Sequence, residues 1–549
     1  MKKKVIIFLI AQLLCYSIVA QNKQVCSIGS PTFKDWKGAK NTKSDQASVA
    51  FNQTLSFTYP DAKRYAKGFR KINNDVADWS EFEGIQFEVF IDEDQTVQFD
   101  ITLKVPEIDA KNLIGETKAQ TSVTGKGWHT VYLTWDALKI NEAQRVGVLR
   151  SIKQISITPK SVNGRKEVQF KNIKLKKAQF VSLYSDIKGK SAKSGQNVSY
   201  EVVVGNTTNV NQSVDLSFQQ EGWESMAATI TPSTFVLKPG ESRVCMMQVT
   251  IPASVPEGSR EKQTLKVIAN GKADKPLTFI TASALPFPNI LHTASRWQEV
   301  KNNITKFDWA KKGLQEYEDL ATKWVVPEVA AKLTNDNANL GMQLFQTQEE
   351  ANFMAAGIAY QLTGKLEYAQ KVALFLRRLS DLDKGYPTTF RACHQSFVQE
   401  GHFFQHIAMA YDMIRPSGVL SDKDIQNIEH TFRLYIETVD KDLGNGAINN
   451  WLLSEITGSI YCALALQDWD LVEKVFYGRQ GVVDHLRQGV MSDGWWYECT
   501  ISYNTWCASE FSQIALALEL WGLDFKNTRY PIGTSKYYSL MPEFKEAGL

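Results

Sequence analysis

The spacing of the apolar residues changes near residue 295 of this 549-residue chain, and that change constrains the fold more than any other feature. From about 26 to 283, apolar and polar residues alternate, as they do in half-buried β-strands. From about 295 onward, apolar residues recur every three to four positions, as they do on amphipathic helices. The sequence therefore predicts a multidomain protein with β-sandwiches first and an all-α region last.

The first β unit is predicted over 26–178. Its strands are expected where the alternation is clearest, at 85–89, 97–101, 129–133, 155–157 and 168–170. Around these runs stand Trp79-Ser80-Glu81-Phe82, Gly127-Trp128-His129 and Thr134-Trp135. With this arrangement the unit resembles the jelly-roll carbohydrate-binding modules of secreted glycan-degrading proteins. The resemblance implies a β-sandwich that either binds sugar or supports a neighbouring domain.

A second β unit is predicted over 179–283, with strands at 198–204, 214–218 and 244–251. Pro239-Gly240 suits a tight turn before the last of these strands. The unit resembles a bacterial immunoglobulin-like β-sandwich of about a hundred residues, and such a spacer usually carries no chemistry. The Pro-Phe-Pro segment at 286–288 then predicts a stiff linker.

The all-α region is predicted over 295–549. Met354, Ile358 and Leu362 indicate one helix face, and Gly364 follows them at a C-terminal cap position. Further helices are expected at 368–379, 399–414, 421–432, 450–466 and 506–520. Short loops between antiparallel helices favour stacked hairpins, which form a bundle, a solenoid or a closed α/α toroid.

Residues 1–20 are predicted to be a signal peptide. Three lysines at positions 2–4 precede an apolar run over 5–14, and Ser17-Ile18-Val19-Ala20 provides a cleavage site. No later stretch holds 18 apolar residues without charge, so no transmembrane segment is expected. We expect the mature chain to be secreted or to reside in the periplasm of a Gram-negative bacterium.

Charge and cysteine content narrow the classes of partner. The net charge of +3, from 62 basic and 59 acidic residues, leaves no electrostatic footprint for nucleic acid. The mature chain keeps six cysteines without a Cys-x-x-Cys pair, which argues against a thiolate zinc site. Cys499 and Cys507 flank one loop, and the sequence leaves open whether they form a disulfide or remain free thiols.

Three segments of the all-α region bring His, Trp or clustered Asn residues close together in sequence: 391–406, 444–451 and 492–504. His402 and His406 are four residues apart and share a helix face, as two metal ligands would. The metalloprotease pattern places Glu directly after the first His, where this chain has Phe403. At these two positions the sequence favours a structural pair or a single catalytic His over a metal pair, so no metal or other cofactor is expected.

The Asn-Asn-Trp motif at 449–451 is expected to open a helix. One Asn suffices as an N-cap, so the second is free for another role. An uncharged amide donates a hydrogen bond to a carboxylate, which is what masking an acid group during proton abstraction requires.

The all-α region resembles the α/α toroid of the heparinase II/III-type polysaccharide lyase superfamily. The resemblance covers roughly 300–530 and rests on these motifs: Phe404-Gln405-His406 with Ala410-Tyr411-Asp412, Asn449-Asn450-Trp451 with Ala463-Leu464-Ala465-Leu466, and Asp493-Gly494-Trp495-Trp496-Tyr497-Glu498 with Ser502-Tyr503-Asn504. Members cleave uronic-acid glycans by β-elimination, so the resemblance implies an acidic polysaccharide or oligosaccharide as partner. The domain layout favours glucuronate-containing plant side chains, such as rhamnose–glucuronate caps.

The resemblance also implies roles for individual residues. By match of motif, Asn450 neutralises the uronate carboxylate and Tyr503 is the acid/base, expected on a loop before a helix near Trp506. The remaining substrate-binding candidates are Asn449, Trp451, Trp495, Trp496, Glu498, Arg391 and His406. Their tryptophans would stack on sugar rings or pack in the core, Glu498 would bind a hydroxyl or orient Tyr503, and Arg391 would pair with a uronate.

Two departures from the family pattern matter. Several members carry a His shortly after the double Asn, where this chain has Ser454-Glu455-Ile456, so His402 becomes the candidate imidazole. Members also carry a large β-sheet domain after the toroid, often with a bound metal, and no such sequence precedes Leu549. The toroid is therefore expected to be incomplete at its C-terminus.

Two other functions remain open from the sequence. An inverting glycoside hydrolase on the same scaffold needs two carboxylates about 6.5–9.5 Å apart, and Glu400, Glu455, Asp493 and Glu498 are available. A non-catalytic glycan-binding protein is the other. Tyr497 competes with Tyr503 as acid/base but is interpreted as pocket wall.

Overall fold

The structure is a computed structural model that describes most of the chain, with gaps. The described residues are 25–29, 36–40, 48–51, 54–59, 66–72, 79–80, 82–104, 115–140, 149, 152–160, 166–219, 225–328, 347–383, 385–386, 397–442, 448–478 and 480–530. The predicted signal peptide over 1–20 lies outside them. Within these ranges, no helix combines the length and hydropathy that a bilayer span requires.

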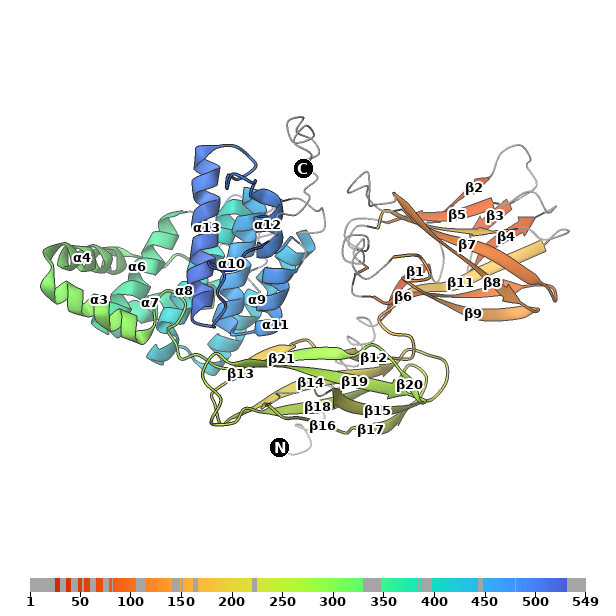
Figure 1. Cartoon of the computed structure of the whole chain (residues 1–549), viewed down its shortest axis with the longest axis horizontal. Helices are drawn as coiled ribbons and strands as arrows, with labels where there is room; N and C mark the ends of the chain where they lie inside the picture. Colours follow the sequence, from red (N-terminus) through yellow and green to blue (C-terminus); the bar gives the residue numbers. More distant parts are fainter. Residues whose placement is uncertain are drawn as a thin grey trace.

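The first unit is a sandwich of two antiparallel sheets (Figure 1). One sheet has the order β3-β4-β11-β6-β9, with β1 paired to β11, and the other has the order β2-β5-β10-β7-β8. Its strands are β1 Val25–Gly29, β2 Trp36–Lys40, β3 Ser48–Phe51, β4 Leu55–Tyr59, β5 Ala66–Lys71, β6 Gly84–Ile91, β7 Thr96–Lys104, β8 Glu116–Thr124, β9 Gly127–Thr134, β10 Gln154–Pro159 and β11 Lys166–Lys176. The five alternating runs recognised in the sequence all lie within these strands.

Aromatic side chains fill the space between the two sheets. Phe87, Phe99 and Phe170 pack with ring centroids 5.5–5.7 Å apart. Trp79 and Trp135 stack on each other and are buried, whereas Trp128 is exposed on β9. Two of the tryptophans that carried the resemblance to sugar-binding modules are therefore core residues.

The second unit is also a sandwich. Its sheets have the orders β12-β14-β18-β16 and β13-β21-β19-β15-β17, with β20 paired to β19, and β13 runs parallel to β21. The strands are β12 Val181–Tyr184, β13 Gly189–Ala192, β14 Asn197–Asn206, β15 Gln212–Gln219, β16 Ala228–Thr231, β17 Thr234–Leu237, β18 Ser242–Thr250, β19 Arg260–Ala269, β20 Lys272–Ala273 and β21 Leu277–Ser283. Figure 1 shows the first sandwich and the helices at opposite ends of this unit.

The C-terminal part of the described chain is helical. Its helices are α3 Ala294–Lys306, α4 Asp308–Lys323, α6 Thr347–Thr363, α7 Leu366–Leu379, α8 Phe397–Ile414, α9 Asp422–Asp442, α10 Asn450–Leu466, α11 Trp469–Tyr477, α12 Val482–Gly489 and α13 Ile501–Glu519, with a short 3₁₀ turn over Arg415–Ser417. The sequence predictions omitted α3, α4, α11 and α12. Cys499 and Cys507 are both free thiols, which settles the question left open above.

Helices α6, α8, α10 and α13 pack side by side as an inner row, with α7 and α9 packed against it. Glycines bring α8 and α10 into backbone contact, because a Cβ on Gly401 would overlap the Ser454 carbonyl and one on Gly458 would meet Gly401. Residues in the first half of α8 thus lie against residues in the first half of α10, so the two helices run parallel. The bond from the Gln361 side chain to the Met413 carbonyl places α6 in the same direction. The helices pack as stacked hairpins, as predicted. Closure of these hairpins into a toroid stays a prediction.

The C-terminal ends of the inner helices face the second sandwich, and we call these ends of α8, α10 and α13 the docking end. The Asp412 carboxylate accepts hydrogen bonds from the backbone N–H groups of Asn289 and Ile290, which follow the predicted linker. The Gln467 side chain exchanges two hydrogen bonds with the backbone of Leu285. The Arg260 guanidinium donates to the Trp521 carbonyl at 2.9 Å.

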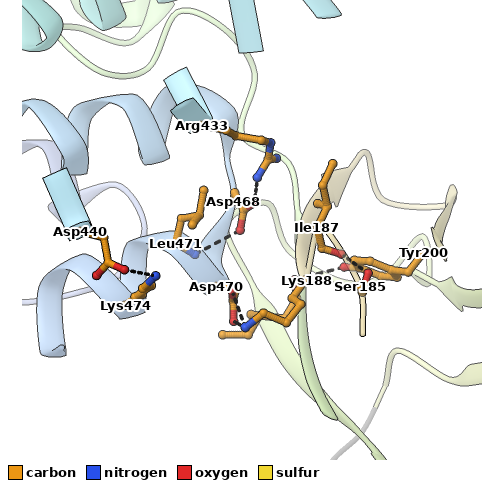
Figure 2. Close-up of polar contacts among 11 residues, drawn as sticks. Ser185, Ile187, Lys188, Tyr200, Arg433, Asp440, Asp468, Asp470, Leu471 and Lys474 are labelled. Atoms are coloured by element: carbon orange, nitrogen blue, oxygen red, sulfur yellow. Dashed lines mark hydrogen bonds and ion pairs between the residues drawn. The ribbon is translucent and has the colours of Figure 1, made fainter. Parts of the chain in front are cut away.

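Ion pairs complete this contact (Figure 2). Lys188 of the sandwich pairs with Asp470 of α11 at 2.9 Å. Asp468 caps α11 by accepting from the Leu471 N–H, and its carboxylate also pairs with Arg433 of α9. Because Asp468 is almost fully buried, this pair is well shielded from water.

Candidate functional site

The N-terminal ends of α6, α8, α10 and α13 lie together, away from the second sandwich, and we call them the open end. Glu350 in the first turn of α6 contacts His402 near the start of α8. Glu510 of α13 lies close enough to His402 for its charge to act on the imidazole. Four parallel helices therefore point the positive ends of their dipoles to one region.

Two histidines and one carboxylate form a compact polar cluster at this end. The Glu350 Oε2 atom lies 2.9 Å from His402 Nδ1 and 3.5 Å from His406 Nδ1. The two imidazole centroids are 4.3 Å apart. The prediction that both histidines share a helix face is therefore confirmed, and Glu350 lies opposite that face.

The electrostatics of the cluster follow from this geometry. Burial raises the pKa of Glu350, but the hydrogen bonds and charges of His402 and His406 outweigh it and lower that pKa to about 2. Burial lowers the pKa of His402, and the bond to Glu350 outweighs it, so that the pKa of His402 is raised. A negative carboxylate thus stays at the cluster across the neutral pH range.

Glu510 adds a second carboxylate from α13. Its side chain is buried and accepts a hydrogen bond from the Trp506 indole N–H at 2.8 Å. Burial raises the pKa of Glu510, although His402 and His406 partly oppose that shift. The open end is therefore rich in both imidazole and carboxylate groups.

The two asparagines at the start of α10 have different roles. The Asn449 Oδ1 atom accepts from the Leu452 N–H at 2.9 Å, which makes Asn449 the N-cap. Asn450 is only 4% exposed, yet its side-chain amide makes no hydrogen bond with the described part of the chain. An amide without such a bond is the group that a substrate carboxylate could use.

Glu498 links the 490–500 segment to α10. Its Oε2 atom accepts from the backbone N–H of Asn450 at 3.0 Å and from the Trp496 indole at 2.6 Å. These bonds do not orient Tyr503, one of the two roles proposed for Glu498. The carboxylate instead fixes the backbone of Asn450.

Three aromatic side chains of the predicted site are exposed, and one is not. Trp451, Trp495 and Tyr503 are 49%, 40% and 39% exposed, respectively. Trp496 is 1% exposed and packs against Gly489, so it offers no face to a sugar ring. Its assignment to substrate stacking was wrong, and the core-packing alternative holds.

Tyr503 lies on a helix and not on a loop, which corrects the sequence-based expectation. α13 begins at Ile501 because Thr500 acts as its N-cap, its Oγ1 accepting from the Tyr503 N–H at 3.1 Å. Tyr497 donates its hydroxyl to the Ile448 carbonyl, and its interpretation as pocket wall stays a prediction. Arg391 lies outside the described residues.

The sequence analysis missed Glu350 and Glu510. Glu349 and Glu350 are acidic residues in a helical first turn, which is a common pattern at exposed helix ends. The signal that would have identified Glu350 is its contact with His402, and 52 residues separate the two in sequence.

No family model and no curated protein matches the chain. Among solved structures, an alginate lyase from Bacteroides ovatus shares 15% identity over 47% of this chain and 83% of its own, with a TM-score of 0.36. A β-1,2-glucanase from Parabacteroides distasonis shares 10% identity over 75% of this chain and 60% of its own, with a TM-score of 0.23.

A family 11 carbohydrate-binding module of a Clostridium thermocellum cellulosomal cellulase is also similar, at 17% identity over 28% of this chain and 93% of its own, with a TM-score of 0.21. The structural neighbours thus include two carbohydrate-active enzymes and a carbohydrate-binding module.

Proposed function

We propose that the protein is a polysaccharide lyase that cleaves uronic-acid-containing glycans by β-elimination at the open end. The observation that carries the proposal is the side-chain amide of Asn450, which the helix cap does not use because Asn449 forms it. The amide lies where the N-termini of parallel helices converge, and such a place favours an anionic group.

The proposed chemistry begins with the carboxylate of the sugar. A proton on the carbon next to a carboxylate is barely acidic until the negative charge is masked. The Asn450 amide would donate to that carboxylate, and the helix N-termini would add a positive potential without a net charge. This combination stabilises the enolate-like charge that develops as the proton leaves.

Tyr503 is the proposed acid/base. Its exposed ring lies on the first turn of α13, on the same end of the helix row as Asn450. A phenolate can take the C5 proton and then return it to the leaving glycosidic oxygen on the same side of the sugar. Trp451 and Trp495 are exposed at the same end and would stack on neighbouring sugar rings.

The four carboxylates considered for an inverting hydrolase do not form an obvious exposed pair. Glu400 and Glu455 are buried, and Glu498 accepts two hydrogen bonds that hold the site together. Asp493 is exposed and accepts from the Trp495 N–H. This arrangement gives the lyase more support than the hydrolase.

The product distinguishes the candidate functions. The chain is incubated with acidic polysaccharides and with neutral β-glucan, while ultraviolet absorbance and reducing ends are followed together. A lyase produces a conjugated C=C bond, so absorbance rises with reducing ends on the uronate polymer alone. Reducing ends without absorbance would mean hydrolysis, and binding without either would mean a non-catalytic glycan-binding protein.

A further inference from the structure

We propose that Glu350, His402 and His406 form a binding site for a divalent transition-metal ion of the zinc type. One potential ligand atom from each of the three side chains lies within 4.8 Å of the others. The proposal departs from the sequence-based expectation of no metal, and it does not depend on the proposed lyase activity.

The separations between Glu350 and each histidine suit tetrahedral coordination. Bonds of about 2.0–2.1 Å at tetrahedral angles put neighbouring ligand atoms about 3.3 Å apart. The measured separations from Glu350 Oε2 to the two Nδ1 atoms are 2.9 and 3.5 Å. Two histidines and one glutamate with one open position make a known type of zinc site.

His406 supplies an independent observation. Its buried Nδ1 atom lies 3.5 Å from the carboxylate oxygen that His402 already contacts, a long contact without the geometry of a good hydrogen bond. A structural His–Glu pair needs one imidazole. A metal ion between the three groups accounts for the second imidazole and for the long contact of its Nδ1 atom.

The surroundings allow entry and favour a cation. The side chains of His402 and His406 are 40% and 21% exposed, so an ion can approach from solvent. The Glu350 side chain is 9% exposed. Glu510 adds a second negative group from α13, and its bond from Trp506 keeps that carboxylate in place. A nearby negative charge strengthens the binding of a cation.

The assignment changes the role of His402. An imidazole that coordinates a metal ion through its lone pair cannot also accept a proton there, so proton transfer at the open end would remain with Tyr503. The open coordination position would take an oxygen ligand, either water or, if the proposed function holds, a carboxylate or hydroxyl of the glycan.

The test measures metal binding directly on the full chain without a histidine tag. The protein is freed of metal with a chelator and titrated with Zn²⁺ by calorimetry and with Co²⁺ by visible absorption. We expect one ion per chain and the intense visible bands of tetrahedral Co²⁺. His406→Gln and Glu350→Gln should each weaken Zn²⁺ binding by at least about 100-fold, because each removes a ligand.

His430→Gln is the matched control, since His430 is exposed on α9 and takes no part in the cluster. It should bind Zn²⁺ like the wild type, and circular dichroism should show that all metal-free variants are folded. Absence of Zn²⁺ and Co²⁺ binding by the folded wild type would overturn the proposal. Binding that survives in both cluster variants would overturn it as well. Neither result bears on the lyase assay, so the two proposals fail separately.

Discussion

The two ends of the inner helices use their polar groups in opposite ways. At the docking end, Asp412, Gln467 and Asp468 are each engaged by backbone groups or by a cation. At the open end, the Asn450 amide has no such bond with the described residues and Tyr503 is exposed. Groups already engaged stabilise the contact between domains, whereas groups without internal partners remain available to a ligand. Changes at the docking end should therefore affect stability, and changes at the open end should affect function.

The largest effect is expected from Arg433→Leu at the docking end. The substitution leaves the buried Asp468 carboxylate without its cation, and breaking a buried ion pair costs about 3–5 kcal/mol. Urea unfolding followed by far-ultraviolet circular dichroism measures the loss in the free energy of unfolding. Arg296→Leu is the control, because its ion pair with Glu299 is exposed and worth at most about 1 kcal/mol. Equal losses in both variants would contradict the distinction.

The next effect separates the two asparagines at the open end. Asn450→Ala should lower turnover by about 10²–10³, by analogy with deleting an oxyanion donor, and should leave the melting temperature nearly unchanged. Asn449→Ala removes the cap and should cost about 0.5–2 kcal/mol of stability while the folded fraction keeps its turnover. Specific activity and thermal melts of both variants test this. If Asn449→Ala instead lost turnover and Asn450→Ala lost stability, the catalytic amide would be that of Asn449 and the account would be contradicted.

A smaller effect is expected on glycan affinity. Trp495→Ala should weaken binding of an acidic polysaccharide by about 0.5–1.5 kcal/mol, which is the range of a stacked aromatic contact. Calorimetric titration measures the change. Leu516→Ala removes a large exposed apolar side chain from α13, beyond its first turns, and should leave affinity unchanged. An equal loss in both variants would mean that the exposed tryptophan forms no specific contact.

The smallest effect belongs to an exposed ion pair at the docking end. Lys262 of β19 pairs with Glu473 of α11 at 2.7 Å, with the lysine side chain half exposed. Lys262→Met should change the free energy of unfolding by less than about 1 kcal/mol, because water and salt screen the pair. Urea unfolding at low and high salt measures it. A loss approaching that of Arg433→Leu would mean that burial is not what distinguishes these pairs.

Strands and several helix boundaries could be predicted because one local pattern determines them. A strand with one buried face alternates, and the runs at 85–89 and 97–101 lie within β6 and β7. α10 covers 450–466 as predicted, since Asn449 caps its start and Gln467 adopts the left-handed conformation at its end. Ser421 and Asp424 likewise form the expected reciprocal cap of α9.

The buried face of α6 could not be predicted from apolar periodicity, because this helix is packed on several sides. In α6, Phe353, Ala356 and Ala359 are buried more deeply than the predicted face of Met354, Ile358 and Leu362, because α6 packs against α4, α7 and α8. Inner helices of this kind have apolar residues on most of their surface, so periodicity does not identify the buried side.

The site was predicted in part for a similar reason. His402 and His406 could be placed together because four residues on a helix fix their geometry. Glu350 could not, because its contact with them depends on how α6 packs against α8. The neighbours Trp495 and Trp496 differ in exposure because Trp496 forms an isolated β-bridge with Val490 and turns inward, which composition alone cannot reveal.

The measurement that tests the central claim most directly compares Tyr503→Phe with the wild type on an acidic polysaccharide. The substitution removes the phenol hydroxyl and keeps the ring on the first turn of α13. If the open end performs β-elimination through this hydroxyl, the rate of C=C formation falls by at least about 10² while glycan affinity changes by less than about tenfold. A Phe variant that forms the unsaturated product at a rate near that of the wild type would contradict the account.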